Sequence, residues 1–242
     1  MTASNTEGCW QYARQRGGAR FEYARCAGGV LAPLGIHFHE ESQLALALDG
    51  NRAFQLGAQV VQVPVGHCLY IPAGMPHRSL PNGPTRCLNL YFSYDRLPRC
   101  HVIFPLPASE LCSNTVEGDD IDAAKLVALI GCRRLAIEAD EWARDDLLRL
   151  VRPDDGTRIG TIAARLGVSR ETFTRSFYRR VGMSPHAFRI VGRLNVARGR
   201  IRNGASIADA AAACGFADQS HLGRHFRRVF GVTPREYLET MR

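Results

Sequence analysis

One eleven-residue pattern occurs twice in the chain, and this repeat constrains the fold more than any other feature. RSFYRRVGMSP begins at Arg175 and RHFRRVFGVTP begins at Arg224, forty-nine residues later; both fit R-x-F-x-R-x-x-G-x-[ST]-P. Each copy follows a short alanine-rich stretch that ends at a glycine, Gly167 or Gly215. The repeat therefore predicts the same supersecondary unit twice within the last ninety residues.

Each copy predicts a short helix, a glycine-containing turn and a longer helix, which together form a helix-turn-helix unit. Ser169 and Asp218 stand where the N-cap of each longer helix is expected. The glycines are 48 residues apart and the arginines 49, so the second turn should be one residue longer. Pro185 suits a helix start, and a helix over 185–202 is expected to join the two units.

Helical spacing divides each longer helix into a core face and a polar face. The core faces are expected to carry Phe173, Phe177, Val181, Leu222, Phe226 and Phe230. The opposite faces carry Arg170, Glu171, Thr174, Arg175, Tyr178, Gln219, Ser220, Gly223, Arg224 and Arg227. Gln, Ser, Thr and Arg suit base edges and phosphates, so the pattern points to a major groove of DNA. The alternative is a plain helical bundle in which these arginines form internal ion pairs.

The C-terminal region resembles the DNA-binding domain of AraC-family transcription regulators, above all in GFADQSHLGRHFRRVFGVTPREY, residues 215–237. The resemblance implies two recognition helices that enter successive major grooves on one face of double-stranded promoter DNA. By position, base-contacting residues carry over to Glu171, Thr174, Arg175, Gln219, Ser220, His221, Gly223 and Arg224, with Arg170 beside them. Arg175, Arg224 and Gln219 have the side chains best suited to that role.

Charge agrees with this placement. The formal net charge is +8, and residues 153–242 carry sixteen Arg against seven acidic residues. A basic surplus confined to one end of a chain is typical of a segment that binds nucleic acid. The chain has one lysine among its 31 basic residues, however, so the abundance of arginine by itself is weak evidence for phosphate contacts.

The first hundred residues predict β-structure, with alternating apolar residues and frequent glycine and proline turns, as in LALALDG at 44–50. Asp49-Gly50 is a hairpin signal. GIHFHEESQLALALDG (35–50) and GHCLYIPAGMPH (66–77) resemble the two cupin motifs, although Gln43 replaces the usual glutamate. The order predicts an N-terminal all-β cupin, or jelly-roll, barrel, and a C-terminal all-α part with two helix-turn-helix units.

Three histidines are the candidate ligands of the barrel. His37 and His39 lie two residues apart, so on a strand both face one side. His77 in the second motif would complete a three-imidazole site for Zn, Ni or Fe, with Gln43 as a poor fourth ligand. The alternative is a metal-free pocket in which His37, His39, Gln43 and His77 bind an organic effector. Tyr70, Arg78 and Tyr91 are further inward candidates.

The sequence divides into three parts: a barrel over 1–112, a linker over 113–137 and a DNA-binding domain over 138–242. The linker carries Ile121, Leu126, Leu129, Ile130 and Leu135 at helical spacing. Apolar residues on more than one face must be covered, so this helix is expected either to pair two subunits or to pack on the barrel, and a homodimer is favoured.

These features predict a sequence-specific DNA-binding transcription regulator whose barrel senses a small molecule or a metal, and which is not an enzyme. The first alternative is a metal-dependent cupin enzyme with an accessory DNA-binding domain; the second is a DNA-binding protein without an effector. RNA polymerase would be a partner if the protein activates transcription. No apolar run is long enough to span a membrane, and no signal peptide is recognised. We therefore expect no membrane association and a cytoplasmic location.

Overall fold

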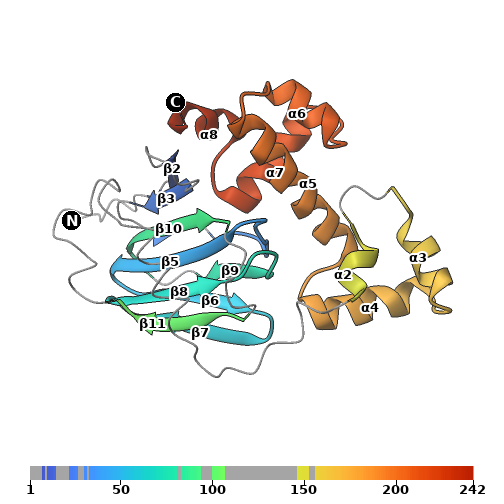
Figure 1. The fold of residues 1–242 in the computed structure, drawn as a ribbon, viewed down its shortest axis with the longest axis horizontal. Coiled ribbons are helices and arrows are strands. Elements are labelled where there is room, and N and C mark those ends of the chain that lie inside the picture. The colour runs from blue at the N-terminus through green and yellow to red at the C-terminus, as the bar shows by residue number, and fades with distance from the viewer. Residues whose placement is uncertain are drawn as a thin grey trace, which may run out of the picture.

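The structure of the protein is a computed structural model, and it describes residues 7–8, 10–14, 22–26, 30–31, 33–80, 83–93, 100–106, 146–152 and 156–241. The N-terminal half is a β-barrel and the C-terminal half is helical, which confirms the predicted fold class (Figure 1). The predicted linker over 113–137, and the dimerisation helix expected within it, lie outside the described residues. None of the helices within the described ranges has the length and apolar character needed to cross a bilayer.

Two sheets form the barrel (Figure 1). The larger sheet has the order β11-β8-β5-β10-β3-β2 and the smaller has the order β7-β6-β9, while β1 and β4 pair separately. The strands are β1 Glu7–Gly8, β2 Trp10–Arg14, β3 Glu22–Cys26, β4 Val30–Leu31, β5 Ser42–Asp49, β6 Arg52–Leu56, β7 Gln59–Val63, β8 His67–Ile71, β9 His77–Leu80, β10 Arg86–Phe92 and β11 Val102–Pro105.

The Asp49-Gly50 hairpin prediction is wrong. β5 pairs with β8 and β10, whereas β6 pairs with β7 and β9, so the chain changes sheets at Gly50. Gly50 has a φ of +71°, and a Cβ there would clash with the carbonyl oxygen of Pro84. Glycine is needed here because the crossing brings two backbones together, not because a two-residue turn closes a hairpin.

The helices form the two expected units. They are α2 Asp146–Leu150, α3 Ile159–Arg165, α4 Arg170–Val181, α5 Pro185–Arg202, α6 Ile207–Ala213, α7 Gln219–Phe230 and α8 Pro234–Thr240. Ser169 and Asp218 accept backbone hydrogen bonds from Thr172 and His221, as N-caps do. Helix α5 spans the distance between the α3–α4 unit and the α6–α7 unit (Figure 1).

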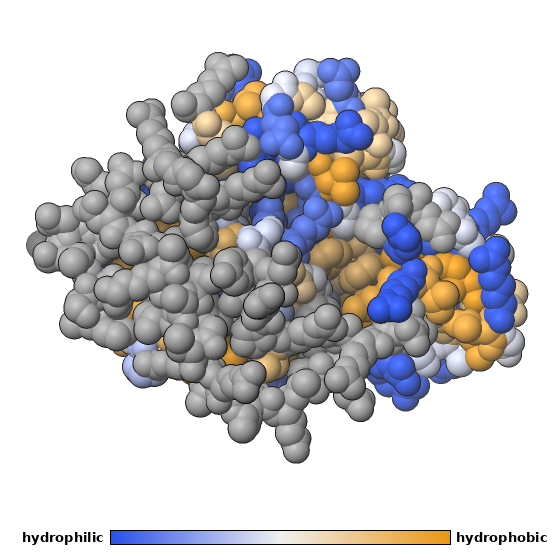
Figure 2. Space-filling view, viewed as in Figure 1, coloured by the Kyte–Doolittle hydropathy of each residue, from blue (hydrophilic) through white to orange (hydrophobic). Residues whose placement is uncertain are grey.

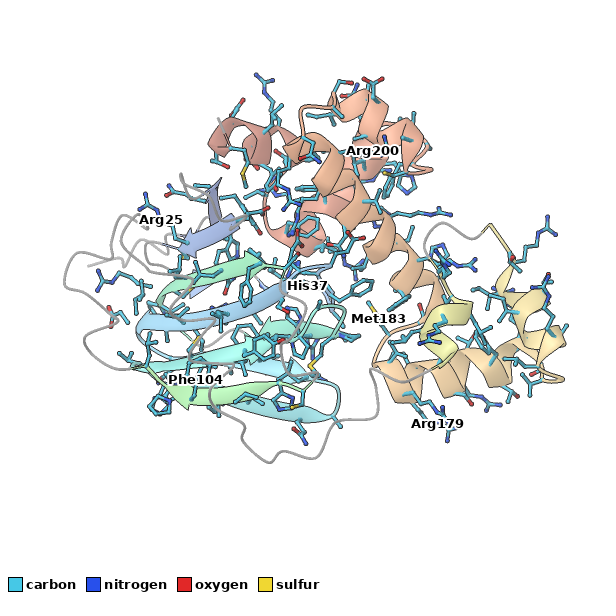
Figure 3. All side chains as sticks on the ribbon, in the orientation of Figure 1. Arg25, His37, Phe104, Arg179, Met183 and Arg200 are labelled. Atoms are coloured by element: carbon cyan, nitrogen blue, oxygen red, sulfur yellow. The ribbon has the colours of Figure 1, made fainter. Side chains whose placement is uncertain are left out.

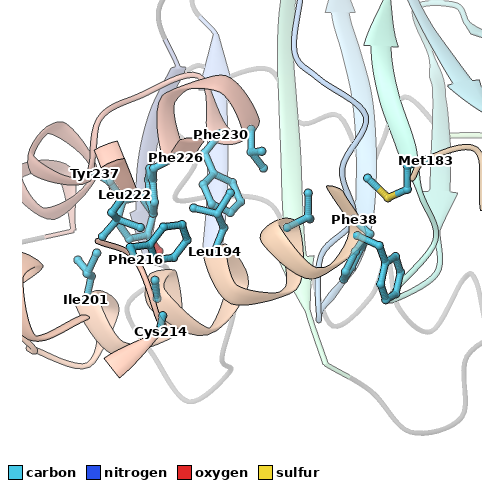
Figure 4. Packing of buried hydrophobic residues seen from close by; sticks show 14 of the residues in the cluster. Phe38, Met183, Leu194, Ile201, Cys214, Phe216, Leu222, Phe226, Phe230 and Tyr237 are labelled. Carbon is cyan, nitrogen blue, oxygen red and sulfur yellow. The ribbon is translucent and has the colours of Figure 1, made fainter. Parts of the chain in front are cut away.

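The barrel and the helical half share one hydrophobic core. Phe173, Phe177, Leu222, Phe226 and Phe230 are buried, as their spacing predicts. The same cluster includes residues of the barrel, namely Trp10, Tyr12, Ala24, Cys26, Phe38, Cys87 and Tyr91. Figure 4 shows Phe38 beside Met183, and Phe226 next to both Tyr237 and Phe230. Burial of apolar surface therefore holds the two halves together, in addition to stabilising each of them.

Candidate functional site

The three histidines meet inside the barrel, where it faces the helices. His37 and His77 exchange backbone hydrogen bonds of 2.9 and 2.7 Å, and His39 follows two residues after His37 on the same face. The ring centroids lie 4.6 to 5.4 Å apart. One ligand atom from each histidine lies within 4.8 Å of the others. Figure 3 shows His37 between the strands and the helical half.

A hydrogen bond at Nδ1 orients the ring of His37, and another at Nδ1 orients the ring of His77. His37 Nδ1 lies 2.7 Å from the carbonyl oxygen of Gly35, and His77 Nδ1 lies 2.8 Å from that of Met75. Carbonyl oxygens only accept hydrogen bonds, so both Nδ1 atoms carry the proton and both Nε2 atoms keep a free lone pair. Metal-binding histidines are held in the same way, because the ring nitrogen that does not face the metal donates to a carbonyl oxygen and fixes the orientation of the ring.

Gln43 is placed as a fourth group of this cluster. Its Oε1 lies 3.0 Å from His77 Nε2. Two acceptor atoms face each other at that distance, and either of two arrangements resolves the conflict: the amide turns its nitrogen toward the ring, or a cation lies between the two atoms. The residues therefore fit a divalent cation, because one nitrogen from each of the three imidazoles lies within 4.8 Å of the others and the Gln43 amide oxygen lies beside His77.

Burial keeps the three imidazoles neutral. It lowers the pKa of His37 to about 4, and it also lowers the pKa values of His39 and His77 well below the ordinary value, with His37 adding to the effect on both. Neutral imidazole is the form that binds metal, so these side chains need not lose a proton near neutral pH.

The space between the histidines is small. The cavity measures about 10 Å³, which is close to the room that one water molecule needs. Its lining comes from both halves of the protein and comprises Trp10, Tyr12, Leu34, His37, His39, Gln43, Arg52, Phe54, His77, Ser79, Asn89, Tyr91 and Val229. Val229 belongs to α7, so the last turn of this helix forms part of the cavity wall.

Two of the predicted inward residues lie elsewhere. Tyr70 pairs with Leu44 on β5 and packs on the opposite face of the large sheet, with Leu46 and Leu88. Arg78 is exposed and donates to Gln55, because it directly follows the inward-facing His77 on β9. Tyr91 does line the cavity. Strand alternation explains all three positions.

Sequence reasoning missed a buried ionic cluster that joins the barrel to α5. Arg198 exposes 1% of its side chain and donates through Nη2 to Glu41 Oε2 at 2.6 Å. Arg202 donates to Glu22 at 2.9 Å and to Glu41 at 2.8 Å. The Tyr237 hydroxyl also donates to Glu22, at 2.9 Å. No local pattern could have revealed these contacts, because the partners stand more than 150 residues apart.

Arg198 links this cluster to the histidines. Its Nη1 lies 3.4 Å from His39 Nδ1, and its guanidinium lies 5.3 and 5.0 Å from the ring centres of Tyr91 and Phe230. His39 also stacks on Phe230 of α7, with 6.1 Å between the ring centroids. The metal-ligand candidates are thus in direct contact with both α5 and α7.

The predicted DNA-contacting residues lie mainly on the surface of α4 and α7. Arg170, Glu171, Arg175, Gln219, Ser220 and Arg224 are exposed, and Thr174, His221 and Gly223 are half-buried. His221 is partly engaged within the protein: its Nδ1 accepts from the Ala217 N–H at 3.3 Å, and its ring meets those of Phe216 and His225. Hydrophilic side chains are widespread over the helical half in Figure 2.

Known proteins resemble this chain in both halves. A cupin domain model matches residues 28–91 and a helix-turn-helix domain model matches residues 162–240. The HTH-type transcriptional regulator MtrA of Neisseria gonorrhoeae is 26% identical to this chain. The matched region covers 66% of this chain and 58% of MtrA. Such relatives are transcription regulators and not enzymes, in agreement with the sequence-based expectation.

Solved structures give the same result. The chain superposes on fatty acid-bound ToxT of Vibrio cholerae with a TM-score of 0.56 and 13% identity, covering 100% of this chain and 98% of ToxT, and this likeness supports the two-part fold. A probable AraC family transcriptional regulator from Rhodopseudomonas palustris is 30% identical over 40% of this chain and 99% of its own length, with a TM-score of 0.37. The matched helix-turn-helix and cupin models and the sequence identity with transcription regulators such as MtrA show that the chain belongs to the AraC family of transcription regulators, with an N-terminal cupin domain.

Proposed function

We propose that this protein is a sequence-specific DNA-binding transcription regulator whose DNA affinity responds to a divalent metal ion in the barrel. The observation that carries the proposal is the contact between the histidine cluster and the end of α7. Helices α4 and α7 would enter successive major grooves, with Arg175, Arg224 and Gln219 as the main base-contacting residues.

A metal ion fits the barrel better than an organic effector does. An organic molecule would need far more space than the 10 Å³ between the histidines, whereas a single ion needs no more than this. Zn, Ni and Fe are the metals that suit three imidazoles. An organic effector remains the second candidate, and it would require the cavity wall to move.

His39 can pass the state of the site to α5. In the structure, the lone pair on His39 Nδ1 faces the guanidinium of Arg198, which can donate hydrogen bonds but cannot accept them. If His39 ligates through Nδ1, that lone pair is no longer available to Arg198. If it ligates through Nε2, the proton must sit on Nδ1 and faces the donor Arg198. Either way His39 loses its hydrogen bond with Arg198, and the position of α5 against the barrel is biased.

The remaining partners are also proposals. The helix expected within 113–137 would pair two subunits, and two linked DNA-binding domains would gain affinity on paired sites. RNA polymerase would be a partner in activation, and the site of action would be the cytoplasm.

Metal binding and DNA binding can be measured on the same full-length protein. Isothermal titration of metal-free protein with Zn²⁺ should give one ion per chain. His77→Ala should abolish this binding, whereas the matched control His186→Ala, an exposed histidine of α5, should retain it. In a gel shift with a selected operator, Zn²⁺ should change the affinity of the wild type but not that of His77→Ala. Equal operator affinity with and without bound Zn²⁺ would exclude metal as the effector.

A further inference from the structure

The wall of the cavity carries a buried cation that the proposed function does not use. Arg52, the first residue of β6, exposes 2% of its surface and lines the same cavity as the histidines. Its Nη1 donates to Asn89 Oδ1 at 2.8 Å. Its guanidinium lies 4.5 Å from the centre of the Phe54 ring and 5.7 Å from that of Trp10.

Arg52 has no negative partner in the part of the chain that the structure describes. No ion pair joins it to a carboxylate there, and no acidic residue lines the cavity. Its Nε is buried and has no hydrogen-bond acceptor within the described ranges. Arg198 differs, because Glu22 and Glu41 balance its charge. A buried, permanently charged guanidinium without a counter-charge is unfavourable, and aromatic rings offset only part of that cost.

We infer that Arg52 is the anion-binding residue of the effector cavity, and that the ligand it accepts is a small monocarboxylate. A guanidinium presents two parallel N–H groups that match a planar carboxylate. One unbalanced positive charge calls for one negative charge. The inference deepens the proposed function, because it concerns the same cavity. A divalent cation on three neutral imidazoles would add positive charge, so an anion is needed whether or not the histidines hold metal.

Binding of a carboxylate must also widen the site. A carboxylate group is larger than the single water that 10 Å³ admits. Leu34 and Val229 close the side of the cavity toward α7. Trp10 closes it near Gly231, where an added Cβ would lie 2.6 Å from the indole Cδ1. The carboxylate therefore displaces the last turn of α7 or the Trp10 ring, and Trp10 reports the event by fluorescence.

The test uses full-length protein carrying Trp142→Phe, which leaves Trp10 as its tryptophan. Fluorescence is titrated with sodium acetate and with sodium formate, and sodium chloride serves as the ionic-strength control. Acetate should give a saturable change that chloride does not give. Arg52→Met should raise the apparent Kd for acetate at least about tenfold, as expected for loss of a charge-assisted hydrogen bond. The control Arg78→Met removes an exposed arginine of the same barrel that also donates to an amide, and it should titrate like the parent.

Several outcomes overturn the inference. One is an Arg52→Met titration equal to that of the parent; another is a chloride response equal to the acetate response. If Arg52→Met fails to fold, Arg52→Lys keeps the charge but not the planar fork, and unchanged acetate affinity in that variant also refutes the assignment. Zn²⁺ stoichiometry measured on the same variants separates this result from the metal proposal: Arg52→Met should still bind one Zn²⁺, and His77→Ala should still bind acetate.

Discussion

Removal of the Arg198 side chain tests whether the buried ionic cluster holds the helical half on the barrel. Arg198→Met keeps most of the buried volume but removes the guanidinium between Glu22, Glu41 and His39. Loss of one partner of a buried ion pair costs about 3–5 kcal/mol, because the other partner stays buried without its counter-charge.

The expected loss lies at the lower end of that range. Glu22 keeps Arg202 and the Tyr237 hydroxyl, each at 2.9 Å, and Glu41 keeps Arg202 at 2.8 Å. Two carboxylates then share one guanidinium that is itself 25% exposed. We therefore expect Arg198→Met to lower the free energy of unfolding by about 3 kcal/mol.

The assay is urea unfolding of the full-length protein, followed by circular dichroism and by tryptophan fluorescence. Arg235→Met is the matched control, because it breaks an exposed i,i+4 pair with Glu239 in which the side chains are 84% and 58% exposed. Such a pair is worth about 0.3–0.5 kcal/mol. If Arg198→Met and Arg235→Met shifted the unfolding midpoint equally at an unchanged slope, the cluster would not be what fixes the two halves.

Three further measurements follow from named contacts. Arg175→Ala and Arg224→Ala should each weaken operator binding in a gel shift by about 1–3 kcal/mol. The control Arg235→Ala should leave operator binding unchanged. Unchanged affinity and footprint of Arg224→Ala would refute the two-groove arrangement. Burial raises the pKa of Glu41, but Arg198 and Arg202 outweigh it, so the folded pKa lies below the ordinary 4.5. The stability that this ion pair contributes is present above that value and is lost as pH falls through the folded pKa, so acid titration should destabilise the wild type more than Arg198→Met. Gly50→Ala should lower the melting temperature more than Gly57→Ala, since both glycines have positive φ but only the first Cβ would meet the Pro84 carbonyl; equal losses would exclude that clash.

The sequence by itself determined the local units of this protein. The two helix-turn-helix units follow from caps, glycines and helical spacing, all of which act within about four residues. Ser169 and Asp218 cap α4 and α7 as expected, and the helix over 185–202 has the predicted bounds. The three histidines also converge as expected, although His37 lies in an isolated bridge to His77 and His39 lies outside the named strands.

Only the tertiary structure decided which faces and which distant residues meet. Asp49-Gly50 has the chemistry of a hairpin turn, yet the chain crosses to the other sheet there, since strand pairing depends on partners far along the sequence. Tyr70 has an apolar ring and a polar tip that suit either face of β8, and its register with Leu44 places it away from the histidines. Charge composition does not reveal that Glu22 and Glu41 balance the charge of Arg198. It also does not reveal that Arg52 lacks a carboxylate partner among the described residues. Those pairings form only when the barrel and the helices pack on each other, because a side chain's electrostatic partners are set by proximity in space and not by position along the chain.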